Sequence, residues 1–167
     1  LEIDGSVKAS QGQLGGQIHA TATKVKLKSG AVIDVSGPQG GGEALIGGGW
    51  QGQDSRITNA KETTAEAGST IQADATQAGN GGTVVLWSDD VTRTAAAISA
   101  RGGTQAGNGG KVETSGKKLL DVTAAAAVNA RTGSGLGGQW LLDPFEIVIA
   151  ATGGPAVNPN LSTIYGG

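Results

Sequence analysis

The chain has no cysteine and no methionine, and only five of its 167 residues are phenylalanine, tyrosine or tryptophan. The lack of cysteine excludes a disulfide scaffold and a thiolate metal site. His19 is the single histidine, so a transition-metal site is not expected either. A globule of this length usually contains more large apolar side chains, whereas a narrow stack lined by isoleucine, valine, leucine and alanine does not need them.

Long runs of one kind of charge or of apolar residues are also missing. The formal net charge is −2, and the basic clusters are limited to Lys24, Lys26 and Lys28 and to the pair Lys117–Lys118. A nucleic-acid-binding protein would normally show a basic face, so we expect no nucleic-acid partner. The longest apolar stretch, residues 145–152, is too short to span a bilayer.

What the chain does have is glycine in a repeating pattern. The heptapeptide TQAGNGG occurs at residues 76–82 and again at 104–110, and looser copies begin at residues 10, 36 and 132. The last three of these five turn cassettes start 28 residues apart. Fixed-period similarity of this length is typical of a solenoid.

Apolar and polar residues alternate on both sides of each cassette, which predicts half-buried strands. After the cassettes, the inward positions are Ile18, Ala44, Val84, Val112 and Trp140. Before the cassettes, the inward pairs are Val7 and Ala9, Ile33 and Val35, Ile71 and Ala73, Ile98 and Ala100, and Val128 and Ala130. Stacking equivalent strands of successive repeats would bury these positions together.

Repeats of this length are too short for a strand–helix–strand unit. The sequence therefore predicts an all-β protein, a right-handed parallel β-helix of about five to six rungs. Residues 1–144 form the repeats, and residues 145–167 form a final strand with a turn-rich tail that caps the stack or leads to another module. One interval between cassettes is 40 residues instead of 28, which places an inserted loop around residues 47–63.

Asn80 and Asn108 share one cassette position. Their amides could form a ladder from rung to rung, or each residue could accept a left-handed turn conformation. Both interpretations are structural.

Catalysis on this fold would require closely placed carboxylates. The best groups are Asp89–Asp90 with Arg93, Glu62 with Glu66, and Asp54 with Arg56. Arg93 and Arg101 suit a lyase by residue type alone. No nucleophile elbow, phosphate loop or calcium-binding repeat accompanies them, so we expect no enzyme, no catalytic residue, no metal and no cofactor.

The three tryptophans are the candidate binding residues. Trp140 holds an inward position and is expected to pack in the core. Trp87 has the outward phase and Trp50 lies in the inserted loop, and an exposed tryptophan can stack on sugars or proteins. We therefore name Trp50 and Trp87 as possible ligand contacts, against the alternative that the loop is a plain surface excursion or a lateral brace.

Several stretches between Trp50 and Pro144 occur in an order that resembles a known family. They are WQGQDSRITNAKET, AGSTIQADATQAGNGGTVVLWSDD, ISARGGTQAGNGGKVETSGKKLLDV and GGQWLLDP. In these the chain is similar to the filamentous-haemagglutinin-type adhesins, which are exoproteins of Gram-negative bacteria exported by two-partner secretion. Asn158-Pro159-Asn160 matches a motif of the family's secretion domain in letters, but its place after WLLDP suggests a shaft segment downstream of that domain.

The resemblance implies a right-handed parallel β-helix, an outer-membrane secretion partner, and a place outside the cell or at its surface, with a role in adhesion, aggregation or biofilm formation. It brings no catalytic residues. Our first hypothesis is a monomeric, non-enzymatic shaft segment. The alternative is a module whose inserted loop binds a glycan or a host receptor, and a polysaccharide lyase or hydrolase is the remote third.

Overall fold

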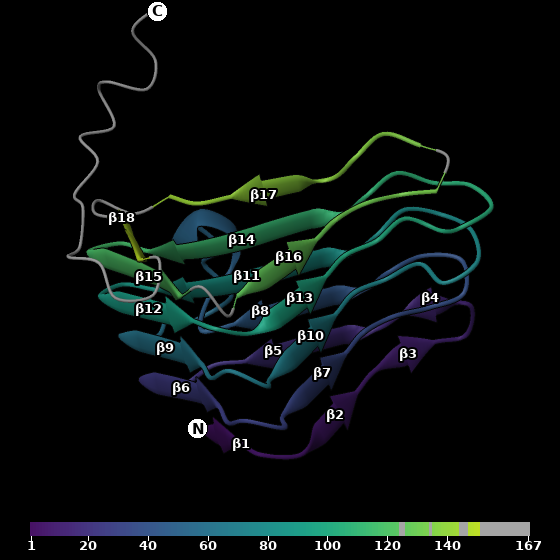
Figure 1. The fold of residues 1–167 in the computed structure, drawn as a ribbon. Helices are drawn as coiled ribbons and strands as arrows, with labels where there is room; N and C mark the ends of the chain where they lie inside the picture. The colour runs from purple at the N-terminus through teal and green to yellow at the C-terminus, as the bar shows by residue number, and fades with distance from the viewer. Residues whose placement is uncertain (124–125, 134, 144–146, 151–167) are drawn as a thin grey trace, which may run out of the picture.

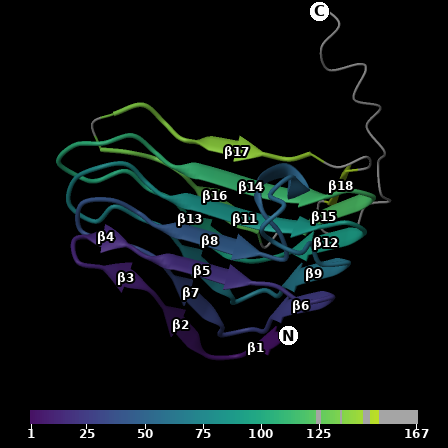
Figure 2. The same ribbon diagram turned by 180° about the vertical axis from the view of Figure 1, so that it is seen from behind.

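The computed structural model describes residues 1–123, 126–133, 135–143 and 147–150. The chain winds into a stack of turns, and each turn adds one strand to each of three parallel sheets (Figure 1). Seen from behind, the same three rows of strands run side by side up the stack (Figure 2). The predicted parallel β-helix is therefore confirmed.

The strands of each sheet follow one another along the stack in chain order. Sheet 1 contains β1 (Glu2–Ile3), β6 (Lys24–Leu27), β9 (Glu62–Ala65), β12 (Val91–Thr94), β15 (Leu119–Thr123) and β18 (Ile147–Ala150). Sheet 2 contains β2 (Ser6–Lys8), β7 (Val32–Asp34), β10 (Thr70–Gln72), β13 (Ala97–Ser99) and β16 (Ala127–Asn129). Sheet 3 contains β5 (Gln17–Ala20), β8 (Glu43–Ile46), β11 (Thr83–Ser88), β14 (Lys111–Gly116) and β17 (Gln139–Leu141).

Five turns are complete, and β18 begins a sixth by pairing with β15. The first cassette differs from the others because it folds into a small antiparallel hairpin, β3 (Ser10–Gln11) with β4 (Leu14–Gly15). Gly12, with a φ of 61°, supplies the left-handed residue of that turn. The division of the chain at residue 144 stays a prediction, since residues 144–146 and 151–167 lie outside the described residues.

The inward positions stack on one another as the alternation predicts. Ile71 pairs in register with Ile33 on one side and with Ile98 on the other, and Val84 lies between Ala44 and Val112. The core runs along the axis of the stack, and its largest fully buried apolar residues include Leu27, Ile33, Ile46, Ile71, Leu86 and Leu120. Small aliphatic side chains fill this narrow space, which explains why so few aromatic residues suffice.

The last glycine of each cassette belongs to a column along one corner. The glycines concerned are Gly16, Gly42, Gly82, Gly110 and Gly138. A Cβ atom on Gly82 would overlap the carbonyl oxygen of Gly42, and one on Gly110 would overlap that of Gly82. The Gly82 amide meanwhile donates to the Ala73 carbonyl, 2.7 Å away, which closes the cassette. Glycine is required here because two backbones approach each other closely.

The cassette asparagines form a ladder of a kind that the sequence did not predict. The side-chain Oδ1 of Asn80 accepts a hydrogen bond from the backbone N–H of Asn108 at 2.8 Å. In turn, Oδ1 of Asn108 accepts from the backbone N–H of Leu136 at 2.9 Å. Each amide therefore bonds to the backbone of the next turn and not to the next amide. The left-handed residues are instead the preceding glycines, Gly79 and Gly107.

Outside, sheet 1 carries ion pairs that join successive turns. Lys28 contacts Glu2 of the turn before at 2.8 Å, while Lys24 contacts Glu62 of the turn after, also at 2.8 Å. Lys118 pairs with Asp90 in the same manner at 2.6 Å. The cluster Lys24, Lys26 and Lys28 that looked basic in the sequence is thus neutralised by its neighbours. No helix among the described residues has the length and apolar character needed to cross a bilayer.

Candidate functional site

Trp87 lies on the outer face of sheet 3, as its phase predicts, but it is covered. Only 6% of its surface is exposed. Together with Leu45 and Val85 it forms a second apolar cluster, and Trp50 and Ile57 of the inserted segment pack against that cluster. The expectation that Trp87 is exposed is therefore wrong, because alternation distinguishes inward from outward positions but does not show what covers the outside.

The inserted segment is shaped to lie flat on the Trp87 indole. A Cβ atom on Gly48 would overlap Cδ1 of that ring, and one on Gly52 would overlap its Cε2 and Cζ2. Hydrogen bonds hold the segment in place: Asn59 Nδ2 donates to the Gly52 carbonyl at 3.0 Å and to Asp89 Oδ1 at 3.2 Å. This geometry is that of a lateral brace.

Trp50 begins a short 3₁₀ turn, η1 (Trp50–Gly52), and reaches one turn further up the outer face. Its ring is half-buried, and Lys111 Nζ lies 5.9 Å from the ring centroid. The next residue, Gln51, donates its backbone N–H to Oε2 of Glu113 at 2.8 Å. The Trp50 ring thus packs against the Trp87 cluster and lies near Lys111. A ligand role for Trp50 or Trp87 stays a prediction.

Glu113 is the buried acid of this face. Its side chain has no exposed surface, and its Oε1 has no hydrogen-bond partner among the described residues. Burial raises the pKa of the Glu113 carboxyl, an effect that the hydrogen bond from Gln51 opposes. Because Glu113 follows the inward Val112, alternation gives it the outward phase and does not predict the burial of its side chain.

Trp140 also departs from the expectation of a packed core residue. It pairs in register with Val112, and its Nε1 donates to Thr114 Oγ1 at 3.0 Å. Nevertheless 40% of its surface is exposed. Its strand, β17, ends sheet 3 and pairs only with β14, so the ring has a turn beneath it and no described turn above it.

The carboxylates considered for catalysis are all in ion pairs. Their partners are Lys24 for Glu62, Lys26 for Glu66, Lys61 for Asp89, Lys118 for Asp90 and Arg56 for Asp54. Hydrogen bonds from Arg56 lower the pKa of Asp54 to about 2, and those from Lys26 and Lys118 lower the pKa values of Glu66 and Asp90. A general acid needs the opposite shift. Four of these ion pairs join neighbouring turns, and the fifth, Asp54 with Arg56, lies within the inserted segment. His19 contacts Glu43 at 3.1 Å.

A second candidate surface lies at the other edge of the cassettes, beyond sheet 2. At this corner Asp74, Arg101 and Arg131 occupy equivalent places in three successive turns, each directly after an inward alanine. Asp74 is only 3% exposed. Arg101 donates to its Oδ2 through Nη2 at 2.7 Å and through Nε at 3.0 Å. This pairing raises the pKa of Arg101 and fixes the guanidinium orientation.

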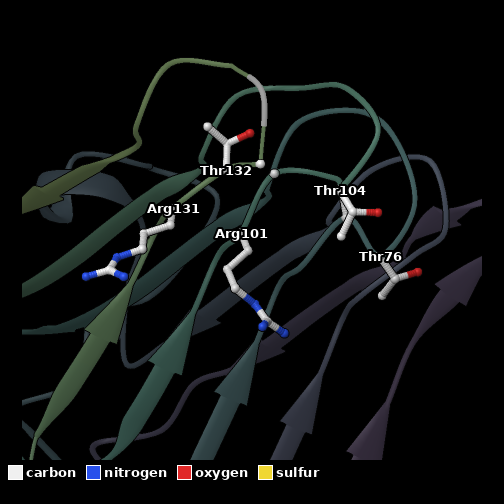
Figure 3. Close-up of a pocket in the computed structure, with 8 residues that line it drawn as sticks. Thr76, Arg101, Thr104, Arg131 and Thr132 are labelled. Carbon is white, nitrogen blue, oxygen red and sulfur yellow. The ribbon is translucent and has the colours of Figure 1, made fainter.

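Two shallow hollows adjoin at Arg101. The first, of about 230 Å³, is lined by Arg101, Arg131 and the threonines Thr76, Thr104 and Thr132 among others, as Figure 3 shows. The second, of about 220 Å³, is lined by Arg101, Gln72, Ser99 and Asn129 among others on the outer side of sheet 2. We call these two hollows together the arginine face.

Sequence reasoning considered Arg101 only as a lyase residue and did not name Arg131. The signal was present, because each arginine directly follows the second residue of an inward pair, Ala100 or Ala130. Its meaning depends on knowing that the pairs stack.

Comparison with solved structures identifies a similar protein. The chain is similar to the HMW1 secretion domain from Haemophilus influenzae, with 37% sequence identity and a TM-score of 0.69. The match covers 85% of this chain and 36% of that one, so the chain spans about a third of the length of its structural neighbour. No family model matches the chain, and no curated protein does.

Proposed function

We propose that this chain is a rod-forming segment of an exoprotein of the filamentous-haemagglutinin type, exported by a two-partner system through an outer-membrane transporter. The observation that carries the proposal is the solenoid fold shared with a secretion domain. The two sequences are 37% identical, and the match covers 85% of this chain. Its motifs resemble the same family of exoproteins. The segment would act outside the cell or at its surface, as a monomer.

Its place in the longer protein is better assigned to the secretion domain than to the shaft downstream of it. The sequence alone favoured the downstream place, because the Asn-Pro-Asn motif follows the repeats. Similarity to a secretion domain supports the other assignment. Either way, the rod would hold a more distant binding region away from the membrane.

A mechanical role agrees with what the outer faces carry. Ion pairs between neighbouring turns neutralise sheet 1, and a brace covers part of sheet 3. No group of three or more histidine, aspartate or glutamate side chains that could hold a metal ion occurs in the described part of the chain. We propose no reaction for the segment.

Export is the experiment that tests this function. The full-length protein would be expressed in a Gram-negative host with its outer-membrane partner, with and without residues 1–143. We expect release into the medium to require both the segment and the partner. Equal release of the protein lacking the segment would contradict the proposal, as would release that does not depend on the partner.

The inserted loop is the second candidate for function, as an element that binds a glycan or a host protein. Its support is the half-buried ring of Trp50, which lies in the same inserted segment as Arg56, whose side chain is 86% exposed. A glycan array probed with the chain and with Trp50→Ala tests it. Loss of a specific signal in the variant supports the loop as a binding element, and an unchanged or absent signal leaves it as a brace.

A further inference from the structure

We propose that the arginine face binds an acidic polysaccharide, which lies along the axis of the rod with its carboxylate or sulfate groups on Arg101 and Arg131. This inference goes beyond the proposed role in export. It uses a surface that neither the brace nor the ion pairs of sheet 1 occupy. The role in export and the binding of a polysaccharide can therefore fail independently of each other.

Charge is the first argument. Arg131 is exposed, and its guanidinium has no carboxylate partner among the described residues. Among the described residues, Arg101 is the cation that pairs with Asp74. One carboxylate therefore stands against two guanidinium groups, and Asp74, Arg101 and Arg131 together carry one net positive charge. Guanidinium groups bind carboxylates and sulfates through paired hydrogen bonds. Most other cations of the chain are already neutralised, including Lys24, Lys28 and Lys118.

Preorganisation is the second argument. The Asp74 carboxylate is buried and accepts from Ser99 Oγ at 3.0 Å, in addition to the Arg101 backbone N–H at 2.7 Å and the Arg101 side chain. The side-chain bonds use Nε and Nη2 of Arg101, and Nη1 makes no described bond to Asp74. The Arg101 side chain remains 52% exposed. A guanidinium fixed in this manner loses little conformational entropy when an anion binds.

The neutral groups favour a sugar polymer over other anions. Gln72 and Asn129 offer amide groups on the outer side of sheet 2, and Thr76 and Thr104 offer hydroxyls at equivalent cassette positions. Amides and hydroxyls match the hydroxyl groups of a sugar. The threonines recur from turn to turn, at roughly 4.8 Å along the axis, as a repeating ligand would need, and the two amides lie two turns apart with Ser99 between them. The two hollows contain no large exposed apolar side chain that could anchor a peptide or enter a membrane.

Direct binding measurements test the proposal. The chain would be titrated with oligogalacturonate, with a heparin oligosaccharide and with neutral dextran, in isothermal calorimetry and by NMR. We expect binding to at least one acidic probe, none to dextran, and amide shifts centred on residues 72–76, 99–104 and 129–133. The two acidic probes distinguish carboxylate from sulfate recognition. Binding should weaken as salt is added.

Arg131→Gln is the decisive variant, because it removes the unpaired guanidinium without breaking a described ion pair. We expect the affinity to fall about tenfold, as for loss of a charged hydrogen bond. Lys117→Gln is the matched control, since Lys117 is also exposed and lacks a described carboxylate partner but lies at the turn between β14 and β15. It should bind as the original chain does.

Three outcomes would overturn the proposal. They are no binding of either acidic probe, equal weakening by Arg131→Gln and Lys117→Gln, and shifts centred on another face. Equal weakening would show that the probe responds to overall charge and not to the arginine face.

Discussion

At the scale of single residues, the glycine column sets how closely successive turns can approach. From the second cassette on, the last glycine of each cassette lies so close to the carbonyl oxygen of the glycine one turn below that a methyl group would not fit between them. The same glycine donates its amide to the carbonyl that closes its own cassette. The position of this one glycine therefore determines both the contact with the turn below and the hydrogen bond that closes the cassette.

Gly82→Ala should lower the free energy of unfolding by about 1–3 kcal/mol, as overpacking does in well-packed interiors. Urea denaturation followed by circular dichroism measures it. Gly137→Ala is the control, because a Cβ atom there would meet no atom within 4 Å. If both variants lose the same stability, the loss does not come from the close approach in the column, because replacing glycine by alanine restricts the unfolded chain and by itself favours folding.

Glu113 gives the chain a pH dependence of defined sign. Burial raises its pKa above the ordinary value of 4.5, so between the two values the folded chain binds more protons than the unfolded chain. Stability therefore falls as pH rises through that interval. Asp54, Glu66 and Asp90 have lowered pKa values, and their contributions are lost at lower pH, as it falls through their folded values.

Glu113→Gln should remove this fall. We expect the unfolding free energy of the original chain, relative to that of the variant, to decrease as the pH rises from 4.5 through the raised pKa of Glu113, and to stay constant above it. Urea titrations of both proteins across that range measure the difference, in which the contributions of the other carboxyl groups cancel. Parallel curves for the two proteins would show that the Glu113 carboxyl is not perturbed by folding.

At the scale of elements, the register of the stack could be predicted from the sequence and the coverage of its outside could not. Ile71 and Val84 lie where alternation placed them, beside Ile33 and Ala44, because a period of two leaves one inward choice. Trp87 and Glu113 share an outward phase, yet both are buried by the inserted segment. Their burial depends on a contact that periodicity does not encode.

The brace predicts different effects for its two tryptophans. Trp87→Ala should cost about 3–5 kcal/mol of stability, the usual range for a buried tryptophan, whereas Trp50→Ala should cost clearly less because its ring is half-buried. Trypsin should also cleave faster at Arg56 or Lys61 in the Trp87 variant. Equal costs, or no change in cleavage, would mean that the segment does not depend on the indole of Trp87.

At the scale of the whole molecule, each turn contacts mainly its two neighbours, so stability is a sum over turns and their interfaces. Lys111 pairs with Gln139 in register, and deletion of residues 111–138 therefore removes one full turn and joins equivalent positions. The shortened chain should fold cooperatively at lower stability. Circular dichroism and urea denaturation measure this.

Deletion of residues 97–110 is the matched control. This half-turn contains β13 (Ala97–Ser99) and a cassette, and its loss would place a sheet 2 strand of one turn against a sheet 3 strand of another. We expect that chain not to fold. Folding of both deletions, or of neither, would contradict a stack built from equivalent turns.

Among the described residues, Gln51 is the one residue other than glycine with a positive φ, at 53°. Left-handed backbone costs an ordinary residue about 1–2 kcal/mol, and here it occurs where the inserted segment meets a buried acid. The local opening with the lowest free energy should therefore begin where Gln51 bonds to Glu113. Hydrogen exchange of a single amide, that of Gln51, would report how often the inserted segment detaches from sheet 3 while the stacked turns stay folded.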